Sequence, residues 1–215
     1  MNYYNPEKHD RKSIRLKNYD YSSNGAYFIT LVTKDREDFF GEIINGEMIL
    51  NEIGKVAFNN WAEINKHFNH VILDEFVIMP NHVHGVIFLD SNDSNCGGVK
   101  LYAQNEQPQK TLTNEKNNYF SNLAPKKNTI SSIIRAYKAS VTSNCRKINH
   151  HEFQWQRNYY EHIIRNEKDL NNIRKYIKEN PMKWFLDKEN KKSEFEKYKF
   201  KSIQEINAFE IKMKE

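Results

Sequence analysis

The chain has 215 residues, which is enough for one good-sized domain with an appendage and too few for two large domains. Hydrophobic residues make up 38% of it, so a packed core can form, while a mean hydropathy of −0.87 indicates long solvated loops or tails. No run approaches the roughly 18 apolar residues of a membrane span, and residues 1–13 lack the apolar stretch of a signal peptide. We therefore expect a cytoplasmic protein with no membrane partner. Cys96 and Cys145 are far apart and form no C-x-x-C pair, which argues against a disulfide framework or a structural zinc site.

The net charge of +5 is concentrated in one segment. Residues 121–165 hold eight basic and two acidic residues, whereas the rest of the chain holds 25 basic and 26 acidic residues. Such a segment suits a phosphate backbone, although a solvated basic face explains it as well. Its basic residues are Lys126, Lys127, Arg135, Lys138, Arg146, Lys147, Arg157 and Arg165.

The first ninety residues predict several strands and one helix. β-Branched and aromatic residues mark the strands, Asn45-Gly46 marks the turn of a hairpin, and Pro80-Asn81 marks a turn between two strands. The expected elements are a strand at 26–33, a hairpin at 38–50, an amphipathic helix at 51–68 and strands at 71–79 and 83–89.

The second half predicts helices around a long polar insertion. Residues 90–128 are rich in Asn, Ser, Gln, Lys and Gly and show no apolar period. Helices are expected at 129–146 and at 166–180, the latter with Asn166 as N-cap and Pro181 as its stop, with a compact aromatic segment at 153–164 between them. This interleaving predicts the α+β class: an antiparallel sheet with helices packed on one face. The expected domain is residues 1–184 with a flexible insertion at about 90–128, followed by a charged tail or peripheral helix at 185–215.

His82 and His84 form the sharpest local feature, in Met79-Pro80-Asn81-His82-Val83-His84-Gly85. Side chains alternate along a strand, so the two imidazoles face the same way and can share a metal ion. The spacing alone is equally that of two polar residues on a solvated face. The neighbouring apolar positions favour a buried pair, and Gly85 suggests room for a ligand to approach.

Tyr176 and Asn180 lie one turn apart on the last predicted helix. Leu170, Ile173 and Ile177 form its apolar stripe, and Tyr176 and Asn180 border that stripe together. A packing tyrosine and a helix-terminal asparagine explain this pattern too. Because Asn180 precedes a proline, it is also biased away from helical angles.

The ordered motifs resemble a known family over about residues 11–184. Gly25-Ala26-Tyr27-Phe28-Ile29-Thr30, the segment from Phe76 to Gly85, Trp155-Gln156-Arg157-Asn158-Tyr159-Tyr160-Glu161-His162 and Tyr176-Ile177-Lys178-Glu179-Asn180-Pro181 carry the resemblance. Together they resemble the REP-associated branch of the single-tyrosine HUH (His-hydrophobic-His) transposases.

The resemblance implies a fold and an active site. The fold is a ferredoxin-like sheet-and-helix domain, similar to the RNA-recognition module, with the histidines on a central strand. Tyr176 is the expected catalytic nucleophile. His82, His84 and Asn180 are the expected ligands of a divalent metal, Mg²⁺ or Mn²⁺. The expected reaction cuts single-stranded DNA beside a hairpin and rejoins strands through a 5′-phosphotyrosine intermediate.

The expected partner is a single-stranded DNA with a hairpin, such as a REP-like sequence or an insertion-sequence end. Arg157 and Arg165 are candidate phosphate contacts, and the exposed bases could stack on Trp155, Tyr159 or Tyr160, although core packing explains those rings too. His162 has an open role: it holds Asn180 or a phosphate, or it is an ordinary core histidine. The remaining candidates for nucleic-acid binding are Arg135 and Lys138.

Two other functions are compatible with the sequence. The chain could be a hairpin-binding module with weak catalysis, or a metal-dependent hydrolase without a covalent intermediate. The intact His82, His84 and Tyr176 favour a transposase. The resemblance leaves the oligomeric state open between a monomer and a homodimer that exchanges the tyrosine helix between subunits.

Overall fold

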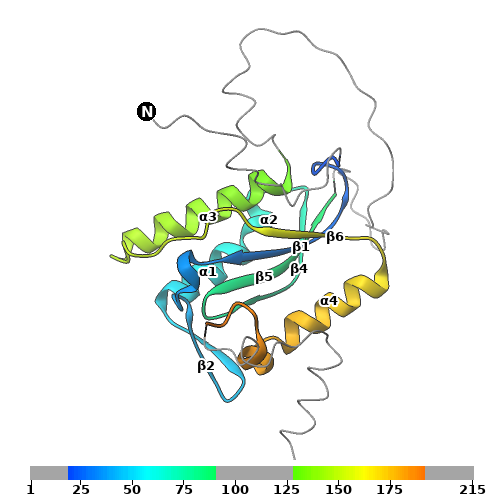
Figure 1. Ribbon diagram of the computed structural model, residues 1–215. Helices are drawn as coiled ribbons and strands as arrows, with labels where there is room; N and C mark the ends of the chain where they lie inside the picture. The colour runs from blue at the N-terminus through cyan, green and yellow to red at the C-terminus, as the bar shows by residue number, and fades with distance from the viewer. Residues whose placement is uncertain (1–18, 91–127, 192–215) are drawn as a thin grey trace, which may run out of the picture.

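A four-stranded antiparallel sheet forms the centre of the computed structural model, which describes residues 19–90 and 128–191 (Figure 1). The strand order is β4-β5-β1-β6, so β5 and β1 are central. The α+β class predicted from the sequence is confirmed. The strands are β1 (Gly25–Val32), β4 (Val71–Ile78), β5 (His82–Leu89) and β6 (Tyr160–Ile164).

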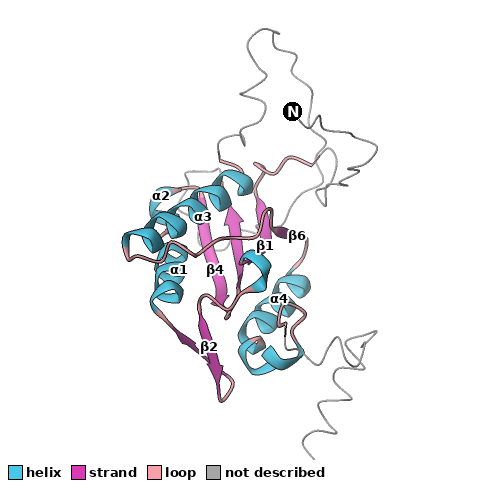
Figure 2. Ribbon diagram, turned by 60° about the vertical axis from the view of Figure 1, so that its left-hand side comes forward, coloured by secondary structure: helices cyan, strands magenta, loops and turns pink. Residues whose placement is uncertain are grey.

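Helices cover both faces of this sheet. Figure 2 shows α1 (Glu52–Ala62), α2 (Ile64–His67) and α3 (Ile130–Lys147) on one side and α4 (Glu167–Glu179) on the other. The larger hydrophobic cluster joins the sheet to α1, α2 and α3. A smaller cluster joins it to Leu170 and Ile177 of α4.

The element order β1-α1-β4-β5-α3-β6 with this strand order is the ferredoxin-like arrangement that the resemblance implied. The predicted packing of helices on one face holds for α1, α2 and α3. The helix α4 is an addition on the opposite face. The reason lies in β1 and β5, which are apolar and buried along nearly their whole length, so both faces of the sheet need a cover.

A short hairpin and two 3₁₀ helices complete the described structure. The hairpin joins β2 (Gly41–Ile44) to β3 (Glu47–Leu50), and its turn residues Asn45 and Gly46 both have positive φ, as the Asn-Gly pair predicted. The 3₁₀ helices are η1 (Lys34–Arg36) and η3 (Pro181–Leu186).

Asparagine side chains cap the N-termini of two helices. Asn51 accepts from the backbone N–H of Gly54 at the start of α1. Asn166 accepts from that of Asp169 at the start of α4, which confirms its prediction as N-cap. The single helix predicted at 51–68 is divided into α1 and α2 at Glu63, whose ψ is 0°.

Several sequence-based predictions concern residues outside the described ranges. Most of the insertion, most of the tail, Cys96, Lys126 and Lys127 belong to this group. The domain boundary at residue 184 stays a prediction, although Leu186, Asp187 and Glu189 beyond it are buried in the domain. Within residues 19–90 and 128–191, no helix has both the length and the apolarity to cross a membrane.

Candidate active site

The two histidines begin the central strand β5 and face α4. His84 lies opposite Thr30 in the pairing of β5 with β1, on the side of the sheet where α4 packs. Both imidazoles are buried, at 0% and 1% exposure, and their ring centroids are 4.4 Å apart. The solvated polar pair, left open by the sequence, is thereby excluded.

Gly85 lies against Trp61 on the face of the sheet opposite to the histidines. A Cβ at this position would lie 2.2 Å from Cζ2 of Trp61, a core residue of α1. The expectation that Gly85 makes room for a ligand is therefore wrong. It makes room for the indole ring, because successive residues of a strand point to opposite faces.

The tautomer of His82 is set by its neighbour Asn81. The Asn81 amide Nδ2 donates to the carbonyls of Arg36 and Glu189, which leaves Asn81 Oδ1 as an acceptor. His82 Nδ1 lies 2.9 Å from that oxygen and must donate to it. The other ring nitrogen, Nε2, therefore carries a lone pair, is buried, and has no hydrogen-bond partner.

Tyr176 brings its hydroxyl to the second histidine. Its Oη lies 3.1 Å from His84 Nε2, while His84 Nδ1 lies 2.9 Å from Thr30 Oγ1. With the phenol protonated, Tyr176 donates to Nε2 and the Nδ1–H donates to Thr30. The Tyr176 residue is 42% exposed, so its ring is accessible from outside although its hydroxyl points inward.

Asn180 follows Tyr176 by one turn and is buried at 3% exposure. Its backbone keeps helical angles (φ −57°, ψ −43°) despite the proline that follows, so the expected distortion is absent. The Nδ2 group donates to Asp187 Oδ2 at 3.1 Å. Asn180 Oδ1 is buried without a partner, as His82 Nε2 is.

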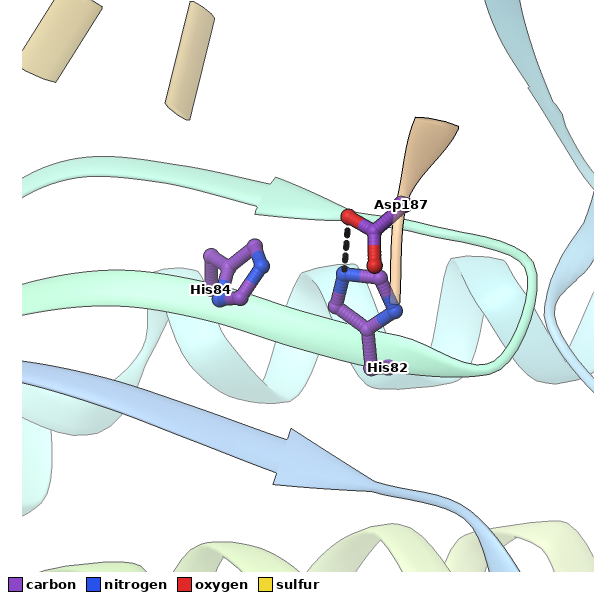
Figure 3. Close-up of side chains that lie close together, drawn as sticks. All are labelled: His82, His84 and Asp187. Atoms are coloured by element: carbon purple, nitrogen blue, oxygen red, sulfur yellow. Dashed lines mark ion pairs between the residues drawn. The ribbon is translucent and has the colours of Figure 1, made fainter. Parts of the chain in front are cut away.

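Asp187 is the residue that sequence reasoning missed. It follows η3, and its carboxylate lies beside the imidazoles, with Oδ2 at 3.9 Å from His82 Nε2 (Figure 3). Ligand atoms of His82, His84 and Asp187 all lie within 4.8 Å of one another. Among the described residues this group offers a cation two imidazoles and a carboxylate.

Burial governs the protonation of the site. It lowers the pKa of His82, against the opposing charges of Asp187 and Glu189. It lowers the pKa of His84 further, helped by His82 and Lys188. Both imidazoles are thus neutral at neutral pH and free to bind a metal. Burial and the charge of Asp187 raise the pKa of the Tyr176 hydroxyl, and a hydrogen bond to Asn180 lowers it.

Two more predicted residues lie on the same face of the sheet. Tyr160 pairs with Thr30 in register and is 47% exposed, with Lys188 Nζ at 5.7 Å from its ring centroid. His162 Nε2 lies 2.9 Å from Asp169 Oδ2, so it connects β6 to the first turn of α4. In this structure its partner is Asp169, whereas Asn180 binds Asp187.

Most of the predicted phosphate contacts lie elsewhere. Arg135 is exposed on α3, behind the sheet as seen from Tyr176, and Arg157 and Arg165 are also exposed. The Lys138 ammonium donates to the carbonyls of Gln156 and Asn158. The Tyr159 hydroxyl pairs with Ser131, and Trp155 packs against the larger core; the basic face of α3 is therefore not part of the histidine site.

Comparison with known proteins identifies relatives of similar length. No family model matches the chain. An uncharacterised protein of Haemophilus influenzae is 43% identical over 185 residues, covering 86% of this chain and 95% of the relative. A second protein of the same organism, named as a REP-associated tyrosine transposase, is 28% identical over 177 residues, covering 78% of this chain and 77% of the relative.

A solved structure is also similar. It is that of a REP-associated tyrosine transposase bound to a REP hairpin, with 17% identity and a TM-score of 0.48 over 80% of this chain and 74% of that chain.

Proposed function

We propose that the chain is a REP-associated tyrosine transposase, as its similarity to a protein of that name suggests, and that it cuts and rejoins single-stranded DNA beside a hairpin. Tyr176 is the proposed nucleophile. The observation that carries the proposal is the position of the Tyr176 hydroxyl, 3.1 Å from His84 in a pair of buried, neutral imidazoles. A tyrosine whose only role is packing does not require a hydroxyl contact with a buried histidine.

The residues of the site fit a divalent cation. His82 Nε2 and Asn180 Oδ1 are buried acceptors without a donor, and a cation is what satisfies two such atoms. His82 and His84 would hold it, with Asn180 as a further ligand. When bound, Mg²⁺ or Mn²⁺ polarises the scissile phosphate and offsets its developing negative charge.

The chain's own groups position the nucleophile. Thr30 orients the His84 imidazole and His84 in turn orients the Tyr176 hydroxyl, so Tyr176 Oη has a defined direction at the cation site. Attack forms the bond from Oη to phosphorus and breaks the bond from phosphorus to the 3′ oxygen. Tyr176 loses its hydroxyl proton and the 3′ oxygen takes one up, which leaves a 5′-phosphotyrosine and a free 3′-hydroxyl. A second 3′-hydroxyl can reverse the step without ATP.

The test is a covalent adduct between the full chain and a labelled hairpin oligonucleotide with a single-stranded flank, in the presence of Mn²⁺. We expect a band of protein joined to DNA on a denaturing gel. Tyr176→Phe should abolish that band and leave hairpin binding intact. Tyr160→Phe is the matched control, because it removes a tyrosine hydroxyl on the same face of the sheet without touching His84.

Three outcomes would contradict the proposal. Binding without an adduct favours a hairpin-binding module. Cleavage that persists in Tyr176→Phe favours a hydrolase in which water is the nucleophile. The absence of both binding and cleavage would exclude nucleic acid as the substrate.

A further inference from the structure

We propose that Asp187 is a ligand of the divalent cation and that the segment 187–189 after η3 is part of the active site. The inference rests on the proposed function for the presence of a cation. It adds a charged ligand from a part of the chain that contains neither the histidine motif nor the tyrosine helix.

The first observation is that two acceptor atoms, His82 Nε2 and Asp187 Oδ2, face each other with no donor between them. His82 Nε2 carries a lone pair because Nδ1 donates to Asn81. Asp187 Oδ2 lies 3.9 Å away from it, too far for a hydrogen bond. Two acceptors that face each other in a buried site repel unless a cation lies between them. The spacing suits one, since metal–nitrogen and metal–oxygen bonds are each about 2.1 Å.

The second observation is how firmly the Asp187 carboxylate is oriented. Oδ1 accepts from the backbone N–H of Glu189 at 2.7 Å, and Oδ2 accepts from Asn180 Nδ2 at 3.1 Å. Its side chain is 4% exposed. Metal-binding carboxylates are held by neighbouring donors in this way, and Asn180 provides such a donor from α4.

The third observation is that hydrogen bonds connect the segment 187–189 to Asn81 and His82. Asn81 connects them directly, because its amide accepts from His82 and donates to the carbonyl of Glu189. The Glu189 carboxylate, 10% exposed, accepts from Arg36 Nε at 2.6 Å. The side chain that sets the His82 tautomer therefore also fixes the segment that presents Asp187.

Charge gives a chemical reason for the assignment. Two neutral imidazoles and the Asn180 amide would make a neutral ligand set, whereas hard cations such as Mg²⁺ and Mn²⁺ favour carboxylate oxygen. Asp187 supplies one negative charge. It thereby adds to the two histidines the carboxylate oxygen that Mg²⁺ and Mn²⁺ favour.

The test is Mn²⁺ binding to the metal-free full chain, measured by titration calorimetry or by electron paramagnetic resonance of free Mn²⁺. We expect Asp187→Asn to weaken the affinity at least about 10-fold, and Glu189→Gln to weaken it about 10-fold through the lost fastening to Arg36. Asp169→Asn is the matched control, since its carboxylate pairs with His162 outside the site, and it should bind as the wild type does.

A cysteine at position 187 distinguishes direct coordination of the metal from a role in which residue 187 only positions other ligands. In Asp187→Cys, Co²⁺ should produce a thiolate-to-cobalt absorption band in the near ultraviolet that the wild type lacks. Mn²⁺ should raise the thermal midpoint of the wild type, and raise that of Asp187→Asn much less.

The proposal is overturned if Asp187→Asn binds Mn²⁺ within two-fold of the wild type, or if the Co²⁺ complex of Asp187→Cys shows no such band. If Asn180→Ala weakens Mn²⁺ binding and Asp187→Asn does not, the ligand is Asn180 and not Asp187. The titration needs no DNA, so its failure leaves the adduct experiment untouched, and a missing adduct leaves the titration valid.

Discussion

The hydroxyl of Tyr176 lies 3.1 Å from Nε2 of His84, although 92 residues separate the two in the chain. This contact joins a late helix to a central strand within one chain. The structure therefore brings together the phenol and the imidazole that the proposed chemistry requires. The roles of Tyr176 as nucleophile and of the histidines as ligands stay predictions.

Tyr160 should contribute more to DNA binding than its neighbour Tyr159. Tyr160 is half exposed on the face of the site, whereas Tyr159 packs against the larger core and pairs with Ser131. We expect Tyr160→Ala to weaken binding of a hairpin with a single-stranded flank by about 10-fold or more, as loss of one stacked base does. Fluorescence anisotropy of a labelled oligonucleotide measures this. Tyr159→Phe is the control and should bind unchanged; a larger loss in that variant would contradict the assignment.

Arg174 holds the tyrosine helix against the edge strand β4. Its Nε donates to both carboxylate oxygens of Asp74, at 3.1 and 3.0 Å, at the register shift of that strand. We expect Arg174→Ala to lower the free energy of unfolding by about 1–2 kcal/mol, a value reduced for partial exposure, and to slow adduct formation because Tyr176 is less well placed.

Urea unfolding and the rate of adduct formation together test this arrangement. Lys175→Ala is the matched control, since its ion pair with Glu179 is exposed and its removal should change stability by less than about 0.5 kcal/mol. If exchanging the charges, Arg174→Asp with Asp74→Arg, restores no stability, the pair is not the cause.

Gly85→Ala should destabilise the fold without touching the metal ligands. The new methyl group would meet the six-membered ring of Trp61 in the core. We expect a loss of about 1–3 kcal/mol by urea unfolding. A smaller ring in Trp61→Phe makes room, so the double variant should lose less than the sum of the single losses. Simple additivity would show that the two sites do not interact.

The metal-free protein should lose stability in mild acid. His82 and His84 have a pKa below 6.5 in the folded state, so the unfolded state binds more protons as the pH falls. Their contribution to the free energy of unfolding is complete above pH 6.5. It decreases as the pH falls from there toward the folded-state pKa values of the two histidines. The expected slope is about 1.4 kcal/mol per pH unit for each histidine that titrates only on unfolding.

Thermal unfolding in the presence of a chelator, between pH 7 and pH 5, measures this slope. His82→Gln and His84→Gln should each flatten it. A variant at the exposed His151, His151→Gln, should leave it unchanged. An identical slope in all four proteins would mean that other groups set the acid limit.

Local sequence was sufficient for most of the framework. The Asn45-Gly46 turn, the Asn166 cap, the end of α4 before Pro181 and the common direction of His82 and His84 are properties of residues close in the chain, and each was predicted from them. The ferredoxin-like order followed from the resemblance, because motifs in the same order indicate the same succession of elements.

Only the tertiary structure decided what surrounds those residues. Asp187 lies in a stretch that reads as a charged tail, and nothing near it in sequence indicates that its carboxylate reaches His82. Gly85 is required because Trp61, 24 positions earlier, packs against it, so the residues next to Gly85 in sequence do not reveal its role. Periodicity and propensity describe neighbours in the chain, whereas packing places α4 and the segment after it over the sheet and so determines which buried polar groups meet.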